Sequence, residues 1–333
     1  MDLYEIADLS FETVLQDKYD LGFFASGYEE RCTYVAERVA PAQIGRIVVL
    51  GFEERTEDRQ RKASDEIFAA WMHVEPRITR ADEDVYLFET LRSGDLEGQQ
   101  NIRILIDYSS MSRLWYSAIL NWAKLMSSGD RIVVDFVYSV GQHLENVPPM
   151  VIRDILAIPG LEGRVSRRGQ SVAVFGLGFD GFASLCVLDR LEPDIVYSFY
   201  AEPAAFPDYP NRVLDNNREM VNHYSKHVLR APLSSVEQTF RSVIELVTQH
   251  RGEAGITLVP MGPKPHVLAA ILAALRLDEI TCLRVSGGRD RTERVIGTGE
   301  VVCTRVEFRS RRGGGSSEQD RGVRNLIDQS WQP

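Results

Sequence analysis

The sequence predicts an α/β fold made of two tandem Rossmann-like domains, each with a doubly wound, mostly parallel sheet. Short apolar runs alternate with amphipathic stretches, and the order of these elements repeats in the second half of the chain. Several short motifs also recur at a nearly constant offset, which indicates an internal duplication. We therefore expect a first domain over residues 1–150, a second over 151–310, and a flexible tail over 311–333.

Composition restricts the classes of protein to which the chain can belong. Of its 333 residues, 44% are hydrophobic and 26% are charged, as in an ordinary globular protein. The net charge of −10 argues against binding to long nucleic acid, because such binding depends on neutralising many phosphates. Four scattered cysteines without a CxxC pair indicate neither a disulfide framework nor a zinc site, and they favour a reducing cytoplasm.

Membrane partners are not expected either. No apolar run reaches the roughly 20 residues that a membrane-spanning helix needs. The N-terminal stretch is acidic and amphipathic and lacks the basic start of a signal peptide. The sequence therefore predicts a cytoplasmic protein.

The first half begins with elements of alternating type. Leu3, Ile6 and Leu9 recur at helical spacing, so residues 1–18 are expected to form a helix. An apolar run over 21–25 that ends in Ser26-Gly27 predicts a strand. The same alternation predicts a helix over 28–39, a strand over 47–52, a helix over 53–73, a short strand over 77–80 and a helix over 84–91.

The stretch from Asn101 to Met126 is the clearest strand–turn–helix unit of the chain. An apolar run around Ile104 stops at Asp107, and large apolar residues then recur at helical spacing from Leu114. The turn between them is rich in serine, and Arg113 stands one step into the helix. Free N–H groups at such a turn suit an anion or a ribose, and the alternative interpretation is that the serines simply cap the helix. A further strand is expected over 132–139.

The second half is expected to repeat this order after a connection over residues 145–168. Gly27-Tyr28-Glu29 has its counterpart in Gly178-Phe179-Asp180, and the turn from Met261 to His266 corresponds to the serine turn. The expected elements are a strand over 171–175, a helix to 191, a strand over 195–200, helices over 211–227 and 236–250, a strand over 256–260, a helix over 264–275, and strands over 280–285 and 301–308.

Ligands of open α/β sheets bind outside the carboxyl ends of the strands, near the point where strand order reverses. The candidate ligand-binding residues lie at or beside these strand ends: Ser26, Gly27, Tyr28, Glu29, Arg31, Asp107, Ser109, Ser110, Ser112, Arg113, Gly178, Phe179, Asp180, Glu202, Gly262, Lys264 and His266. Backbone amides with Arg113 or Lys264 suit a phosphate, and Asp107 or Glu29 suits a ribose. Tyr28 and Phe179 suit stacking on a base or plain core packing.

Two alternatives concern catalysis and cofactors. Glu29 and Asp107 are candidate catalytic carboxylates, since a carboxylate beside a ribose can stabilise an oxocarbenium-like transition state. The run Gly176–Gly181 has the GxGxxG spacing of a dinucleotide fingerprint, with Glu202 near the place of a ribose-binding acid. Asp180 would put a carboxylate into that phosphate turn, so a glycine-rich turn without cofactor is favoured. No cofactor and no metal site is identified.

The turn Asp107-Tyr108-Ser109-Ser110-Met111-Ser112-Arg113 resembles the second motif of CARF domains. An Asp, a hydroxyl residue two positions on and a basic residue six positions on follow a core strand in that family. Two such units in one chain also look like a SAVED domain. Met111 stands where a glycine is usual, and the second half lacks the Asp–hydroxyl pattern.

The resemblance implies a sensor of nucleotides or cyclic oligonucleotides in prokaryotic antiviral defence. No effector domain is recognisable in the sequence, so a protein partner or effector is expected. Two other hypotheses stay open. One is an enzyme that cleaves a glycosidic or phosphodiester bond of a nucleotide or nucleoside, and the other is a structural interaction module.

Overall fold

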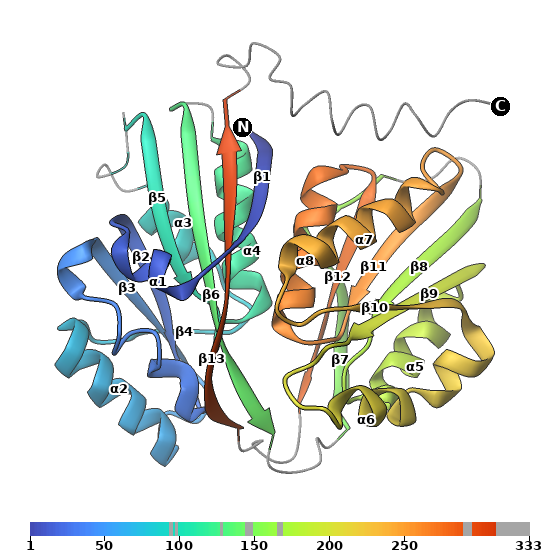
Figure 1. The fold of residues 1–333 in the computed structure, drawn as a ribbon, viewed down its shortest axis with the longest axis horizontal. Coiled ribbons are helices and arrows are strands. Elements are labelled where there is room, and N and C mark those ends of the chain that lie inside the picture. Colours follow the sequence, from blue (N-terminus) through green and yellow to red (C-terminus); the bar gives the residue numbers. More distant parts are fainter. Residues whose placement is uncertain are drawn as a thin grey trace.

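The computed structural model contains two mixed, mostly parallel β-sheets with interleaved helices, so the predicted α/β class is confirmed (Figure 1). It describes residues 1–92, 96, 99–126, 129–143, 149–164, 169–288 and 295–310. The tail predicted over 311–333 lies outside the described residues. Within these ranges, no helix is long and apolar enough to cross a membrane.

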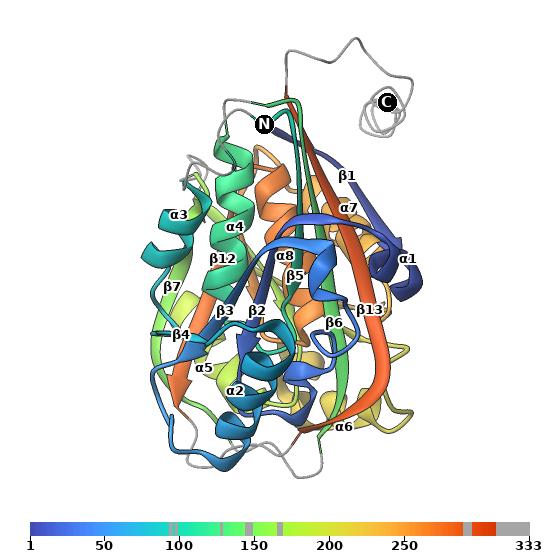
Figure 2. The ribbon, with the colours of Figure 1, turned by 90° about the vertical axis from the view of Figure 1, so that its left-hand side faces the viewer.

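The first sheet has seven strands in the order β1-β13-β6-β5-β2-β3-β4. Its five strands from β6 to β4 run parallel, and β13 is antiparallel to both β6 and β1 (Figure 2). The strands are β1 (Asp2–Leu9), β2 (Tyr19–Ser26), β3 (Ile44–Phe52), β4 (Arg77–Thr79), β5 (Asn101–Asp107), β6 (Arg131–His143) and β13 (Val295–Arg309). The helices of this half are α1 (Phe11–Gln16), α2 (Arg59–Met72), α3 (Val85–Leu91) and α4 (Arg113–Leu125), with short 3-10 turns η1 (Glu30–Thr33) and η2 (Pro41–Gln43).

The second sheet has six strands in the order β10-β9-β8-β11-β12-β7. All neighbours are parallel except β7, which pairs antiparallel with β12. The strands are β7 (Val151–Glu162), β8 (Gln170–Gly176), β9 (Ile195–Ala201), β10 (Ser225–Ala231), β11 (Ala254–Pro260) and β12 (Ile280–Gly288). The helices are α5 (Gly181–Leu191), α6 (Tyr209–Asn216), the π-helical turn η3 (Met220–Tyr224), α7 (Val236–Thr248) and α8 (Lys264–Arg276).

The two sheets share one topology. The row β4-β3-β2-β5-β6-β13 corresponds position by position to β10-β9-β8-β11-β12-β7, and the last strand of each row is antiparallel. In each half the chain first builds outward on one side of the opening parallel strand and then crosses to the other side. The order therefore reverses between β2 and β5 and again between β8 and β11, which are the two topological switch points.

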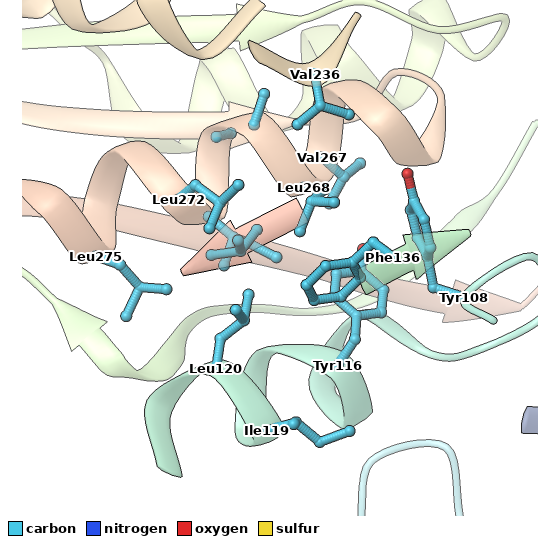
Figure 3. Packing of buried hydrophobic residues seen from close by; sticks show 14 of the residues in the cluster. Tyr108, Tyr116, Ile119, Leu120, Phe136, Val236, Val267, Leu268, Leu272 and Leu275 are labelled. Atoms are coloured by element: carbon cyan, nitrogen blue, oxygen red, sulfur yellow. The ribbon is translucent and has the colours of Figure 1, made fainter. Parts of the chain in front are cut away.

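Helices α4 and α8 lie between the two sheets and join them into one hydrophobic core. Tyr116 and Leu120 of α4 face Leu268 and Leu272 of α8 (Figure 3), and all four side chains are buried. Separate apolar clusters fill the outer face of each sheet, under α2 in the first half and under α5 in the second. The packing of α4 on α8 fixes how the strand ends of the two halves meet.

Several sequence predictions are corrected by the structure. The first residues form the strand β1 and the short α1 instead of a helix over 1–18. Of the helix expected over 28–39, only a 3-10 turn is present. The connection expected over 145–168 contains β7, and the helix expected over 211–227 ends early and gives way to β10.

The division into domains also differs from the expected ranges. Residues 295–309 were expected in the second domain, but they form β13 of the first sheet. The difference is explained by tertiary pairing. The outer side of β12 is already paired with β7, whereas the outer side of β6 is open to β13 and pairs with it. The strand expected over 301–308 is thus present and antiparallel, in the other half of the molecule.

Candidate functional site

The carboxyl ends of β2 and β5 meet at the switch point of the first half. These two strands are parallel neighbours, paired from Leu21 with Ile104 onward. A Cβ atom at Gly27 would lie 2.9 Å from the Cβ of Ser110, so the loop after β2 touches the loop after β5. A larger residue at position 27 would therefore push the two loops apart, so the close contact between the loops explains why a glycine stands here.

An ion pair occupies the loop after β2. The Nε of Arg31 lies 2.6 Å from Oε2 of Glu29, and its Nη1 donates to the carbonyl of Ser139 at 2.6 Å. Its guanidinium also lies 4.9 Å from the ring centre of Tyr138. Burial by itself raises the pKa of Glu29, but the charges of Arg31 and Lys264 outweigh it and hold that pKa below its ordinary value. Glu29 is thus an anion at neutral pH, with a side chain still 29% exposed.

Asp107 ends β5 and is sealed from solvent. Its Oδ1 accepts hydrogen bonds from the backbone N–H and the hydroxyl of Ser109, at 3.0 and 2.5 Å. The hydroxyl of Ser109 in turn accepts the backbone N–H of Ser139 at 2.8 Å, which ties the end of β5 to β6. Burial raises the pKa of Asp107 to about 6, against the lowering effect of the Ser109 bonds.

Three buried oxygens around this turn make no hydrogen bond within the described residues. They are Oδ2 of Asp107 and the hydroxyl oxygens of Ser110 and Ser139. An unmade hydrogen bond to a buried polar atom costs about 1–3 kcal/mol, so folded proteins rarely keep such atoms together without cause. These three oxygens can still accept hydrogen bonds from a further donor.

Lys264, the first residue of α8, crosses from the second half to the serine turn of the first. Its Nζ donates to the carbonyls of Tyr108 at 3.0 Å and Met111 at 2.7 Å. Burial lowers the pKa of Lys264 to about 7, and the charge of Glu29 opposes that shift. An amine held in this way changes charge near neutrality, which suits either anion binding or proton transfer.

Aromatic side chains of the second half close one side of this region. His143, the last residue of β6, packs edge-on against Phe179 with ring centres 5.4 Å apart, and its backbone N–H donates to the hydroxyl of Tyr209 at 2.9 Å. Phe179 also packs edge-on against Tyr209 at 5.0 Å. Arg212 lies over both of these rings. Residue Phe179 thus comes together with the end of β6, as a site between the halves requires.

The outer side of the first loop is held by a second polar network. The hydroxyl of Ser26 donates to Asp65 at 2.5 Å, and Asp65 also accepts from Nε of the fully buried Arg61 at 2.9 Å. Tyr28 stacks on Phe52 with ring centres 5.8 Å apart, and its hydroxyl donates to the carbonyl of Glu54. Tyr28 is only half-buried.

The remaining candidates have structural partners of their own. Ser112 caps α4 and Asp180 caps α5 through backbone N–H groups. Arg113 begins α4, close enough to Lys264 to influence its pKa. Gly178 and Gly262 belong to loops that pack against each other.

Two further candidates lie away from the serine turn. Glu202 accepts a hydrogen bond from the hydroxyl of Tyr200 at 2.6 Å and pairs with Arg230 at 3.1 Å, at the end of β9. His266 is fully buried on α8 beside Phe199, and burial lowers its pKa to about 4.

Three contributors to the site are not among the candidate ligand-binding residues predicted from the sequence. Ser139 and His143 stand at the end of β6, and Arg61 lies within a charged stretch that resembled a solvated helix face. The polar ending of the predicted strand over 132–139 is a signal for Ser139, whereas His143 lies beyond that range because β6 is longer than predicted. Only the fold reveals that Arg61 turns inward beneath the loop after β3, where its Nη1 donates to the carbonyl of Phe52 at 2.6 Å.

Comparison of the sequence with protein-family models gives no match, and comparison with curated proteins gives no significant match.

Proposed function

We propose that the protein is a nucleotide-binding sensor whose ligand lies where the strand ends of the two halves meet. We call this place the convergent edge and define it by Glu29, Arg31, Asp107, His143 and Lys264. The observation that carries the proposal is the reach of Lys264 across the two halves to the serine turn, beside a buried carboxyl with an unpartnered oxygen.

The chemistry of the convergent edge supports a ligand with both phosphate and ribose. Lys264 supplies a positive charge to an anion and has one N–H left after its two carbonyl bonds. The unpartnered oxygens of Asp107 and Ser139 suit the hydroxyl donors of a ribose. Phe179 and Tyr28 offer ring surface for a base.

A biological setting follows from the resemblance of the serine turn to CARF and SAVED domains. On that basis the ligand is a nucleotide or a cyclic oligonucleotide made during antiviral defence, and the protein passes its signal to a partner effector. Ligand binding at the junction of two halves gives such a sensor a direct means to change their relative position.

A panel of nucleotides and cyclic oligonucleotides tests the proposal by thermal shift and by chromatography of the ligand after incubation. A sensor is stabilised by its ligand and returns it intact. The variant Lys264→Met should bind at least tenfold more weakly, whereas Lys226→Met, a change of the same type at an exposed position on β10, should bind normally. Normal binding by Lys264→Met, or the absence of any ligand in the panel, counts against the proposal.

The second candidate function is an enzyme that acts on a nucleotide or nucleoside. It is favoured by two groups at the convergent edge whose pKa values approach neutrality, Asp107 at about 6 and Lys264 at about 7. Chromatography would then reveal products. A Glu29→Gln or Asp107→Asn variant that binds the ligand without converting it would identify the reacting carboxylate.

A further inference from the structure

The two switch points have the same topology and different chemistry. In the first half, Asp107 follows β5 and keeps an unpartnered oxygen. The corresponding strand of the second half, β11, ends at Pro260, which has no side-chain donor or acceptor. A symmetric pair of polar sites would need matching groups at both positions.

Asp180 corresponds to Glu29, and its carboxylate makes structural hydrogen bonds. Asp180 accepts the backbone N–H of Ala183 at 3.0 Å and that of Met150 at 2.7 Å, so it caps α5 and anchors the start of β7. Glu29 in contrast pairs with Arg31 and has a side chain that is 29% exposed, and the charges of Lys264 and His143 help to lower its pKa.

The loops of the second switch point meet through their main chains. A Cβ atom at Gly178 would lie 2.5 Å from the carbonyl oxygen of Met261, and one at Gly262 would lie 2.8 Å from that of Leu177. At the first switch point, Gly27 instead faces the side chain of Ser110, whose hydroxyl is unpartnered. At the second switch point, main-chain atoms therefore occupy the place that the side chain of Ser110 takes at the first.

Lys264 completes this asymmetry. It belongs to the second half, but both of its hydrogen bonds go to carbonyls of the first. Oδ1 of Asn217, a residue that donates to the carbonyl of Gly178, is also unpartnered within the described residues, so the second switch point keeps one polar atom of its own. The buried carboxyl group and the lysine, however, meet at the first switch point.

We infer that each chain takes one asymmetric ligand with a single cluster of negative charge, of the class of a nucleoside mono- or diphosphate. A two-fold symmetric cyclic dinucleotide presents the same phosphate and base twice and needs two equivalent loops, which the switch points do not supply. This inference rests on the proposed function and narrows its ligand class.

Titration calorimetry on the full chain tests the inference with nucleoside 5′-mono- and diphosphates and with cyclic di-AMP and cyclic di-GMP as probes. We expect one mononucleotide per chain and at least tenfold weaker binding of both cyclic dinucleotides. Asp107→Asn should weaken mononucleotide binding tenfold or more. Asp194→Asn, an isosteric change at the amino ends of β8 and β9, far along both strands from the switch point, should leave it unchanged.

The possible results separate the inference from the proposed function. Tighter binding of a cyclic dinucleotide that is lost in Asp107→Asn overturns the inference and leaves the proposed function standing. Two equivalent mononucleotide sites per chain do the same. If no probe binds, the inference is wrong, and the larger cyclic oligonucleotides of the thermal-shift panel decide whether the proposed function is wrong as well. Should Asp107→Asn fail to fold, as judged by circular dichroism, Lys264→Met takes its place in the same titrations.

Discussion

Replacing Asp107 by Asn should change the pH dependence of stability in a way that follows from the burial of this carboxyl group. The side chain is 1% exposed, and burial raises its pKa from 3.8 to about 6. Between these two values the folded protein holds a proton that the unfolded chain releases. The stabilisation is therefore fully present below about pH 4 and is lost as the pH rises through 6.

The size of the effect follows from the shift. A difference of about two pKa units corresponds to about 3 kcal/mol of free energy of unfolding, at roughly 1.4 kcal/mol for each unit. Asparagine does not ionise in this range, and its amide oxygen can accept the same two bonds from Ser109. Relative to the wild type, the variant should therefore gain about 3 kcal/mol of stability between pH 4 and pH 7.5.

Urea unfolding at pH 4, 5, 6 and 7.5, followed by tryptophan fluorescence, measures this difference. Trp115 and Trp122 lie buried on α4, directly after the serine turn. Asp194→Asn is a control that should show little pH dependence in this range, because hydrogen bonds from Ser171 hold the pKa of Asp194 below its ordinary value and the carboxylate is ionised in both the folded and the unfolded chain at most of these pH values. If Asp107→Asn differs from the wild type by the same amount at every pH, the carboxyl group is not buried in the way described here.

Three further predictions follow from the packing and the charges. Arg305→Met should cost about 3–5 kcal/mol in urea unfolding, because it strips the buried Asp135 of two hydrogen bonds, and adding Asp135→Leu should recover much of that loss. Gly178→Ala should cost about 1–3 kcal/mol in the same assay, since the new methyl meets a main-chain carbonyl. In thermal unfolding, wild-type stability should rise from pH 7 to pH 9, because the unfolded chain still binds a proton at Lys264 that the folded protein has released. Lys264→Met should abolish this rise.

Much of the fold could be predicted because local patterns and tertiary structure agree along the central units. The stretch from Asn101 to Leu125 forms the strand and the helix that its apolar periodicity indicates. The same holds for β11 and α8. In these units a short continuous apolar run indicates the buried strand, and the longer apolar stretch after the turn indicates the helix, so each pattern favours one type of element.

The N-terminal segment shows why other elements were predicted wrongly. Leu3 and Ile6 are three positions apart, which matches a helical repeat. In β1 a bulge between Leu3 and Glu5 inserts an extra residue, so that Leu3 pairs with Phe308 and Ile6 with Val306 on the same face of the sheet. A bulge depends on pairing with a strand about 300 positions away, which no local pattern records.

Parts of the candidate site depend on distant pairing in the same way. The sequence indicated that Glu29, Asp107 and Lys264 follow strand ends, and the switch-point rule placed such ends together. That Lys264 donates to Tyr108 and Met111 follows instead from the packing of α4 on α8. The sequence could indicate which residues stand at the edge, and the packing of the halves decides which of them meet.

Two buried aspartates on neighbouring strands differ in how their carboxyl groups are hydrogen-bonded. Asp135 on β6 is fully buried, and its carboxylate accepts two hydrogen bonds from Arg305 and one from Tyr19. Asp107 on β5 is equally buried, but one of its oxygens has no partner within the described residues. A fully paired network is the usual solution for a buried charge, and Asp135 shows that this sheet provides one. The missing partner at Asp107 therefore does not follow from burial as such, and it sets this carboxyl group apart from that of Asp135.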